Sequence, residues 1–359
     1  LIFGSIIASI SITLYILCPE KREMMKNRRI TRFLILLSFL MIGSMLYGNI
    51  TKPYSVNHIW SESDKADSLT GFDVQMYELT LSINEQTHYI NGNVLATVLA
   101  EENLSYIEYN LVGLTVNSVL VNNIPAAYTH SNGIIHINLN ISAGSTFTTQ
   151  VFYSGIPQLS SDIYHIGMIF TANSVFTISD PDAARYWWPC YDHPWDKAII
   201  NLTITIRSDW KVAANGLRTN IVNNGDGTST TYWIGQYPMT TYLVCVTCGP
   251  YVEFDQSMEE LPIINFVLPG QYNNALITLS RVPMMIDYFS QLFGPYPFEK
   301  YGHAVVNMST YGAMEHQTMT TLGNYIINGT LAYETTIAHE LAHQWYGDAV
   351  SFLTFKDVW

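Results

Sequence analysis

Apolar and polar positions alternate along many short stretches between residues 49 and 253 of this 359-residue chain. The clearest examples are Tyr77–Ile83, which reads YELTLSI, and Ile200–Ile206, which reads INLTITI. This alternation is typical of strands with one buried face. Turn-forming residues separate the stretches, at Asn91-Gly92, Asn132-Gly133, Asn215-Gly216 and Asn223–Ser229. The pattern predicts an all-β, sandwich-like domain over residues 49–253.

From residue 254 to the end, apolar residues recur at helical spacing instead. Asn274–Phe293 predicts one helix, with Pro283 in its first turns or at a kink. Leu331–Val350 predicts a second helix. We therefore expect a separate domain at 254–359, and a multidomain fold class that runs from β to α+β.

Two apolar runs, 1–17 and 33–48, flank a basic stretch at the start of the chain. In one interpretation translation starts at Met24 or Met25, and residues up to 48 form a secretory signal or a retained anchor. In the other, both runs cross the membrane as a hairpin. The signal fits better because each run is short for a span. Either way, we expect the rest of the chain to be secreted or membrane-anchored, outside the cytoplasm.

The composition narrows the class of partner. The chain has 16 Lys and Arg against 29 Asp and Glu, a formal net charge of −13, so nucleic acid is not an expected partner. Membrane contact is expected only through residues 1–48. The four cysteines are too few and scattered for a disulfide framework, and Cys245 and Cys248 are expected to be buried strand residues.

The second predicted helix carries the pattern H-E-x-x-H, at His339, Glu340 and His343. Two His residues four apart project from one helix face, and their nitrogens suit Zn2+. A carboxylate beside them can take a proton from a water as it attacks a carbonyl and pass it to the leaving amine. The spacing predicts peptide-bond hydrolysis at a zinc site.

Glu315 lies 24 residues before His339, within the stretch TYGAMEHQTM. A lone Glu in a loop is usually a solvated surface charge. Beside a peptidase zinc helix, however, a fixed carboxylate would hold a substrate's free α-ammonium group by charge-assisted hydrogen bonds. That arrangement accepts chain termini and predicts an aminopeptidase.

These motifs together resemble the aminopeptidase N family of zinc metallopeptidases. PCYDHPWDKA at 189–198, GAMEH at 312–316 and HELAHQW at 339–345 match three of its motifs in order, and FGPYPFEK at 293–300 is similar to the segment before the second. The resemblance covers roughly residues 70 to 359. It implies a thermolysin-like catalytic domain and peptide substrates with a free amino terminus.

The resemblance also assigns roles to residues. His339 and His343 would bind Zn2+, Glu340 would be the general base and Glu315 would bind the substrate's amino group. Gly312 and Ala313 would offer backbone to the substrate, and Asp180 falls where the family often has a second residue that reads the amino group. His316 replaces the family's usual Asn.

In this family the third zinc ligand is a Glu separated from the second His by eighteen intervening residues. Only sixteen residues follow His343 here, so that ligand and the family's transition-state Tyr are expected beyond Trp359. We interpret the chain as the amino-terminal part of a longer protein and expect it to be inactive alone. Alternatives are a non-catalytic scaffold that retains the fold, or a bifunctional epoxide hydrolase and aminopeptidase. Glu315 argues against a thermolysin-type endopeptidase.

Overall fold

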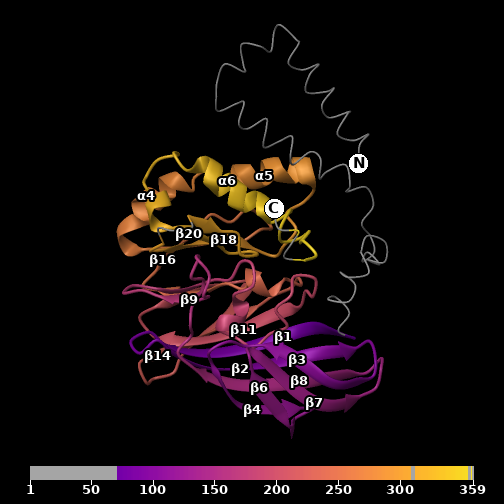
Figure 1. Ribbon diagram of the computed structural model, residues 1–359. Coiled ribbons are helices and arrows are strands. Elements are labelled where there is room, and N and C mark those ends of the chain that lie inside the picture. Colours follow the sequence, from indigo (N-terminus) through magenta and orange to yellow (C-terminus); the bar gives the residue numbers. More distant parts are fainter. Residues whose placement is uncertain (1–70, 309–311, 355–356, 358–359) are drawn as a thin grey trace, which may run out of the picture. The chain divides into compact units, whose positions relative to one another are not determined.

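The computed structural model describes residues 71–308, 312–354 and 357. The apolar segment expected at residues 1–48 lies outside this range. Across the described ranges the strands form four sheets (Figure 1). No helix within the same ranges is both long enough and apolar enough to cross a membrane.

The largest sheet has eight strands. In spatial order they are β13 (Leu217–Asn223), β14 (Thr228–Ile234), β11 (Ile199–Arg207), β1 (Phe72–Asn84), β2 (Tyr89–Ala100), β8 (Thr146–Gly155), β4 (Thr115–Val121) and β5 (Ile124–Pro125). Neighbouring strands are antiparallel except β1 and β11, which run parallel with Met76 opposite Ile199. The predicted alternation is confirmed in β1, where Leu79 and Leu81 are buried and Thr80 is exposed.

A three-stranded sheet packs against this large sheet. Its strands are β3 (Leu104–Asn110), β7 (Ile134–Ile141) and β6 (Tyr128–Ser131). Ile107 and Ile137 from the small sheet share one buried apolar cluster with Val151 from β8. Burial of each such side chain stabilises the fold by about 1.5–3 kcal/mol. Tyr109 and Thr149 join the two sheets through a 2.8 Å hydrogen bond between their hydroxyl groups.

A four-stranded sheet follows, with β12 (Lys211–Ala214), β15 (Val246–Gly249), β10 (Val175–Ile178) and β9 (Gly167–Phe170) in spatial order. Cys245 and Cys248 are fully buried at β15 with free thiols, as expected from the sequence. The PCYDHPWDKA stretch forms a packed loop after the short 3-10 helix η3 (Ala184–Tyr186). Trp187 and Trp188 next to it are fully buried.

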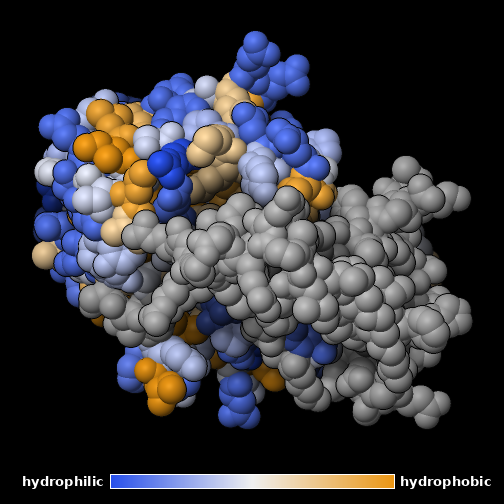
Figure 2. Space-filling view, turned by 90° about the horizontal axis from the view of Figure 1, so that it is seen from above, coloured by the Kyte–Doolittle hydropathy of each residue, from blue (hydrophilic) through white to orange (hydrophobic). Residues whose placement is uncertain are grey.

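The carboxyl-terminal region is α+β. Its sheet contains β16 (Val252–Asp255), β17 (Ile263–Val267), β18 (Tyr301–Val306), β20 (Thr320–Gly323) and β19 (Ala313–Met314), in that order. The helices are α4 (Tyr272–Thr278), α5 (Val282–Phe293) and α6 (Glu334–His343), and they lie on one face of the sheet (Figure 1). Seen from above, the surface has hydrophilic side chains interspersed with hydrophobic ones (Figure 2). The exposed hydrophobic residues of α4 and α5 include Leu276, Ile277, Met284, Tyr288 and Leu292.

Both predicted helices differ from the observed ones. The single helix expected at Asn274–Phe293 is two helices, because the chain turns after α4 and Pro283 sits in the first turn of α5, where its missing N–H costs nothing. The helix expected to reach Val350 ends at His343. Gly347 then adopts φ +134, and the N–H of Asp348 bonds back to the carbonyl of His343 at 3.0 Å.

The predicted turns are confirmed except one. Asn132 and Gly133 form the tight turn between β6 and β7, with positive φ at both residues. Asn91-Gly92, in contrast, lies inside β2, and the hairpin turn occurs at residues 85–88. Packing overrides the turn signal here: a Cβ on Gly92 would lie 2.8 Å from the carbonyl oxygen of Thr80, so the position requires glycine within a strand.

The order of the elements confirms the expected fold class, an all-β amino-terminal part followed by an α+β part. The boundary predicted after residue 253 falls inside β16, which pairs with β17 in the five-stranded sheet.

Candidate active site

Helix α6 brings its two histidines together. The Nε2 atoms of His339 and His343 are 3.1 Å apart, and the two rings are almost perpendicular, at 87°. His339 is exposed and His343 is half-buried. Both nitrogens therefore converge on one point at the helix surface, as the four-residue spacing predicts.

The outer nitrogen of His343 is held by the backbone. Its Nδ1 lies 3.0 Å from the carbonyl oxygen of Tyr346. A carbonyl accepts only, so Nδ1 carries the hydrogen and the lone pair of Nε2 faces His339. Burial lowers the pKa of His343, and the carbonyl of Tyr346 opposes that shift. The neutral, correctly oriented imidazole is the form that binds a metal.

This geometry fits a zinc ion. Nitrogen ligands lie about 2.0–2.1 Å from zinc, so two of them on a tetrahedral ion are about 3.3 Å apart. The observed 3.1 Å separation matches that spacing. His339 and His343 therefore fit as two ligands of such an ion. Within the described ranges, no group of three or more His, Cys, Asp or Glu side chains could hold a metal ion.

Glu340 lies next to this pair, on the buried side of α6, with 7% of its surface exposed. Burial, together with the smaller effect of the nearby charge of Glu315, raises the pKa of its carboxyl group to about 8. A divalent cation beside it would favour the ionised form and lower that pKa. The protonation state of Glu340 is therefore expected to depend on whether a metal is bound.

Two further carboxyl groups lie near each other. Glu315 directly follows β19, and Asp180 follows β10 in a different sheet. Burial raises the pKa of Asp180 to about 6, with Glu315 as the next largest cause. Burial also raises the pKa of Glu315, and the charge of His339 opposes that shift. Half-buried acids that repel one another favour a bound cation.

Gly312 and Ala313 lie at the edge of the five-stranded sheet. Strand β19 pairs with β20 on one side and is last in the sheet order. Gly312 has φ +83, and its carbonyl accepts a 2.7 Å hydrogen bond from the N–H of Gly323. A Cβ on Gly312 would also lie 3.0 Å from the hydroxyl of Tyr325. Glycine keeps this edge narrow and its backbone accessible.

His316, where the family usually has Asn, is fully buried. Its Nδ1 lies 3.0 Å from the hydroxyl of Thr321, and its Nε2 has no hydrogen-bond partner in the described part of the chain. Burial lowers the pKa of His316 to about 3, so the ring is neutral. The departure from the family pattern therefore lies inside the fold, beneath β19.

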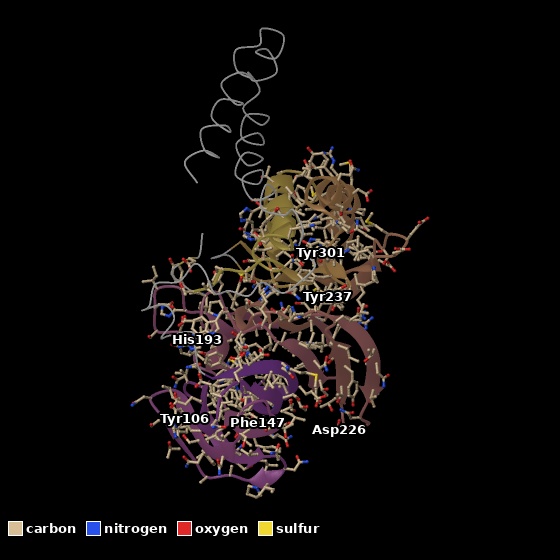
Figure 3. The ribbon with its side chains drawn as sticks, turned by 90° about the vertical axis from the view of Figure 1, so that its right-hand side faces the viewer. Tyr106, Phe147, His193, Asp226, Tyr237 and Tyr301 are labelled. Atoms are coloured by element: carbon tan, nitrogen blue, oxygen red, sulfur yellow. The ribbon has the colours of Figure 1, made fainter. Side chains whose placement is uncertain are left out.

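Aromatic packing anchors the end of α6. Trp345 Nε1 donates to the carbonyl of Gly294 at 3.0 Å, and its ring contacts Phe289 and Tyr296 edge-on, with centroids 6.1 and 5.4 Å away. Tyr301 on β18 lies near this helix (Figure 3), and burial raises the pKa of its hydroxyl, with the charge of Glu340 adding to the shift. The end of α6 is therefore held by packing against α5 and the segment Gly294–Tyr296.

Four residues with structural roles at this site were not identified from the sequence. Gln344 and Asp348 lie beside the metal helix, Lys197 comes from the PCYDHPWDKA loop, and Lys300 is fully buried beneath β20. Each of the four residues lies within or next to one of the sequence motifs described above. Their contacts join segments far apart in sequence, which no local pattern reveals.

Comparison with protein families identifies the chain. The Peptidase M1 N-terminal domain matches residues 74–243, and the Peptidase family M1 domain matches residues 277–359. The chain belongs to peptidase family M1, the aminopeptidase N family. The metal of this family's peptidases is Zn2+, in agreement with the fit of the two histidines.

Curated relatives of this M1 chain include archaeal and human aminopeptidases. Probable aminopeptidase 1 of Sulfurisphaera tokodaii is 24% identical over 298 residues, which are 80% of this chain and 37% of the relative. Endoplasmic reticulum aminopeptidase 1 of Homo sapiens is 26% identical over 50% of this chain and 20% of its own length. The chain thus spans well under half the length of these relatives.

Solved structures share the fold. The M1 zinc metallopeptidase of Deinococcus radiodurans is 28% identical with a TM-score of 0.71, over 79% of this chain and 66% of that one. A variant of that protein bound to a Tyr-Ser-Ala substrate matches with a TM-score of 0.71 and 27% identity, over 79% of this chain and 67% of that one. The M1 identification confirms the resemblance seen in the motifs. The roles of individual residues remain predictions.

Proposed function

We propose that the protein carrying this chain is a zinc aminopeptidase that removes the amino-terminal residue from peptides. The observation that carries this proposal is the convergence of His339 Nε2 and His343 Nε2 at one point, beside Glu340 and the paired acids Asp180 and Glu315. The similarity to aminopeptidases supports the same conclusion.

Glu340 is the proposed general base. When bound, Zn2+ polarises the scissile carbonyl and lowers the pKa of a water to about 7. Glu340 takes the proton of the attacking water and then protonates the leaving amine. Its buried position on α6 excludes bulk water and keeps the proton available for return.

Glu315 and Asp180 are the proposed anchors for the substrate's α-ammonium group. Two carboxylates around one cation favour a free amino terminus and exclude a blocked one. Gly312 and Ala313, at the edge of the sheet, would pair with the extended substrate backbone by strand addition. Together these contacts place the first peptide bond at the metal.

The test uses the full-length protein and two substrates, leucine p-nitroanilide and its amino-terminally acetylated form. We expect rapid hydrolysis of the first and little of the second, with loss of activity on chelation and recovery with Zn2+. Equal cleavage of both, or cleavage of acetylated peptides at internal bonds, contradicts an aminopeptidase. An inactive but folded and zinc-loaded protein points to the scaffold alternative, and hydrolysis of an epoxide substrate points to the bifunctional one.

We also infer that the catalytic part is secreted or membrane-anchored, from the basic and then apolar order of residues 1–48. Expression of the full-length protein with a carboxyl-terminal tag tests this. Recovery in the medium or in membranes supports the inference, and recovery only in the cytoplasm contradicts it.

A further inference from the structure

The side chain of Gln344 joins the metal-binding helix to the loop that begins at Glu315. Gln344 directly follows His343 and is completely buried. Its Nε2 donates to the carbonyl of Glu315 at 2.8 Å, and its Oε1 accepts from the backbone N–H of Thr318 at 2.8 Å. The side chain of Gln344 therefore bonds to both Glu315 and Thr318 in this loop, from a position next to the proposed metal ligand His343.

Both donors of this amide are used. A primary amide has two N–H donors and an oxygen with two lone pairs. Nε2 also donates to Oδ2 of Asp348 at 2.7 Å and lies 3.4 Å from the carbonyl of His316. The hydroxyl of Tyr296, which has one hydrogen to donate, lies 3.0 Å from Oε1 and 2.9 Å from the carbonyl of Lys300. The reverse orientation would set an N–H group against the N–H of Thr318. The amide therefore has one orientation and holds the loop in one position.

The loop adopts a conformation that needs such support. Thr318 has φ +68, a left-handed conformation that costs a β-branched residue on the order of 1–3 kcal/mol. Its hydroxyl accepts from the N–H of Gly216 at 2.9 Å, and its carbonyl accepts from Nζ of Lys300 at 3.1 Å. With Gln344 on its N–H, every polar group of Thr318 is held. Contacts from outside the loop impose its shape.

We propose that Gln344 is a positioning residue that fixes the separation between the carboxylate of Glu315 and the metal-binding imidazole of His343. The inference rests on the proposed function. A peptide whose ammonium group is held at Glu315 presents its first peptide bond to the metal at a distance set by this connection. Gln344 therefore makes removal of one residue at a time the preferred reaction.

The test compares full-length wild-type protein with Gln344→Met and Gln344→Glu. Methionine removes every hydrogen bond of the amide, while glutamate keeps its shape and loses both donors. We expect KM for leucine p-nitroanilide and the Kd of L-leucine amide, measured by calorimetry, to rise roughly tenfold or more, as the loss of charge-assisted bonds at Glu315 implies. Bound Zn2+ per protein stays unchanged, and the preference for free over acetylated substrate falls.

Gln317→Met is the matched control. Gln317 lies in the same loop and is 1% exposed, but its side-chain amide has no hydrogen-bond partner within the described residues. This variant is expected to keep the wild-type KM, Kd and substrate preference. Equal losses in the Gln317 and Gln344 variants would mean that any change in the loop has the same effect and would overturn the inference.

The remaining outcomes separate the inference from the proposed function. Wild-type protein that hydrolyses neither substrate overturns both. Active wild-type protein with unchanged KM and Kd in the Gln344 variants overturns only the positioning role. A purely structural role would lower Tm and kcat together without weakening L-leucine amide, and that result also contradicts the inference. If Gln344→Met fails to fold, the isosteric Gln344→Glu variant supplies the result.

Discussion

Lys197 Nζ donates hydrogen bonds to the backbone carbonyls of Asp348 and Ala349, at 2.7 and 3.1 Å. The lysine comes from the PCYDHPWDKA loop, and the two carbonyls belong to the turn that follows α6. A residue about 150 positions earlier in the chain therefore holds the turn at the end of α6. Lys197 therefore connects the PCYDHPWDKA loop to the segment that follows the HELAH motif.

Lys197→Met is expected to lower the free energy of unfolding by about 1–3 kcal/mol, because the part-buried carbonyl of Asp348 and the exposed carbonyl of Ala349 lose a charged donor. Chemical denaturation measures the change. The control is Lys211→Met, since Lys211 is 44% exposed and pairs with Glu253 at 3.3 Å. An exposed pair contributes about 0–1 kcal/mol. Equal effects of the two variants would show that the turn does not depend on Lys197.

Lys300 makes stability depend on pH. Burial lowers the pKa of Lys300 from 10.5 to about 7, so between these values the unfolded chain binds a proton that the folded chain does not. Stability from this group therefore rises with pH above about 7, by on the order of a few kcal/mol over the full range. Denaturation between pH 7 and 9 should show this rise in the wild type and a smaller one in Lys300→Met. Parallel curves would contradict the assignment.

Glu340→Gln is expected to reduce kcat of the full-length enzyme by about 10²–10⁴, the usual contribution of a general base. Zn2+ binding should be unchanged, because the substitution leaves His339 and His343 intact. Metal analysis and steady-state kinetics measure both. Near-normal turnover in this variant would remove Glu340 from the mechanism.

Glu315→Gln and Asp180→Asn are each expected to raise KM for leucine p-nitroanilide about tenfold or more, since each removes a charge that faces the substrate's ammonium group. The double variant should lose less than the product of the two effects, because both acids bind one cation. Asp182→Asn is the control, since Asp182 pairs with Arg185 at 3.5 Å. A control that behaves like Asp180→Asn would mean that general charge, not position, decides binding.

Gly92→Ala should destabilise the β-rich part by on the order of 2 kcal/mol or more, because its Cβ would lie 2.8 Å from the carbonyl oxygen of Thr80 and 2.9 Å from the hydroxyl of Tyr153. Gly270→Ala is the comparison, because a Cβ at Gly270 meets nothing within 4 Å. Thermal denaturation distinguishes them. Similar Tm values would show that β2 can shift to accept a methyl group.

Local patterns predicted the parts of the fold that depend on neighbours in sequence. Tyr77–Ile83 and Ile200–Ile206 are strands because their alternation matches a half-buried sheet. The Asn91-Gly92 signal was wrong because β2 continues through it, with Gly92 packed against Tyr153. The helix predicted to reach Val350 was too long because the chain turns at Gly347, and Lys197, which lies far away in the sequence, holds that turn.

The features of the candidate site also differ in whether local sequence could predict them. The i, i+4 spacing of His339 and His343 was enough to predict their convergence, because one helix fixes both. The approach of Asp180 to Glu315 followed only from the family resemblance, since the two residues come from different sheets. Gln344 was not identified because its partners at Glu315 and Thr318 lie elsewhere in the chain.

The parallel pairing of β1 with β11 has a consequence for synthesis. As the chain leaves the ribosome, β1 can pair with β2 at once, but its other edge has no partner until Ile199 emerges opposite Met76. An unpaired edge in a nascent chain invites pairing with a neighbouring molecule. Truncations that end before residue 199 should therefore aggregate in cells, while those that extend past Ile234, and so include β11, β13 and β14, should be recovered in better yield.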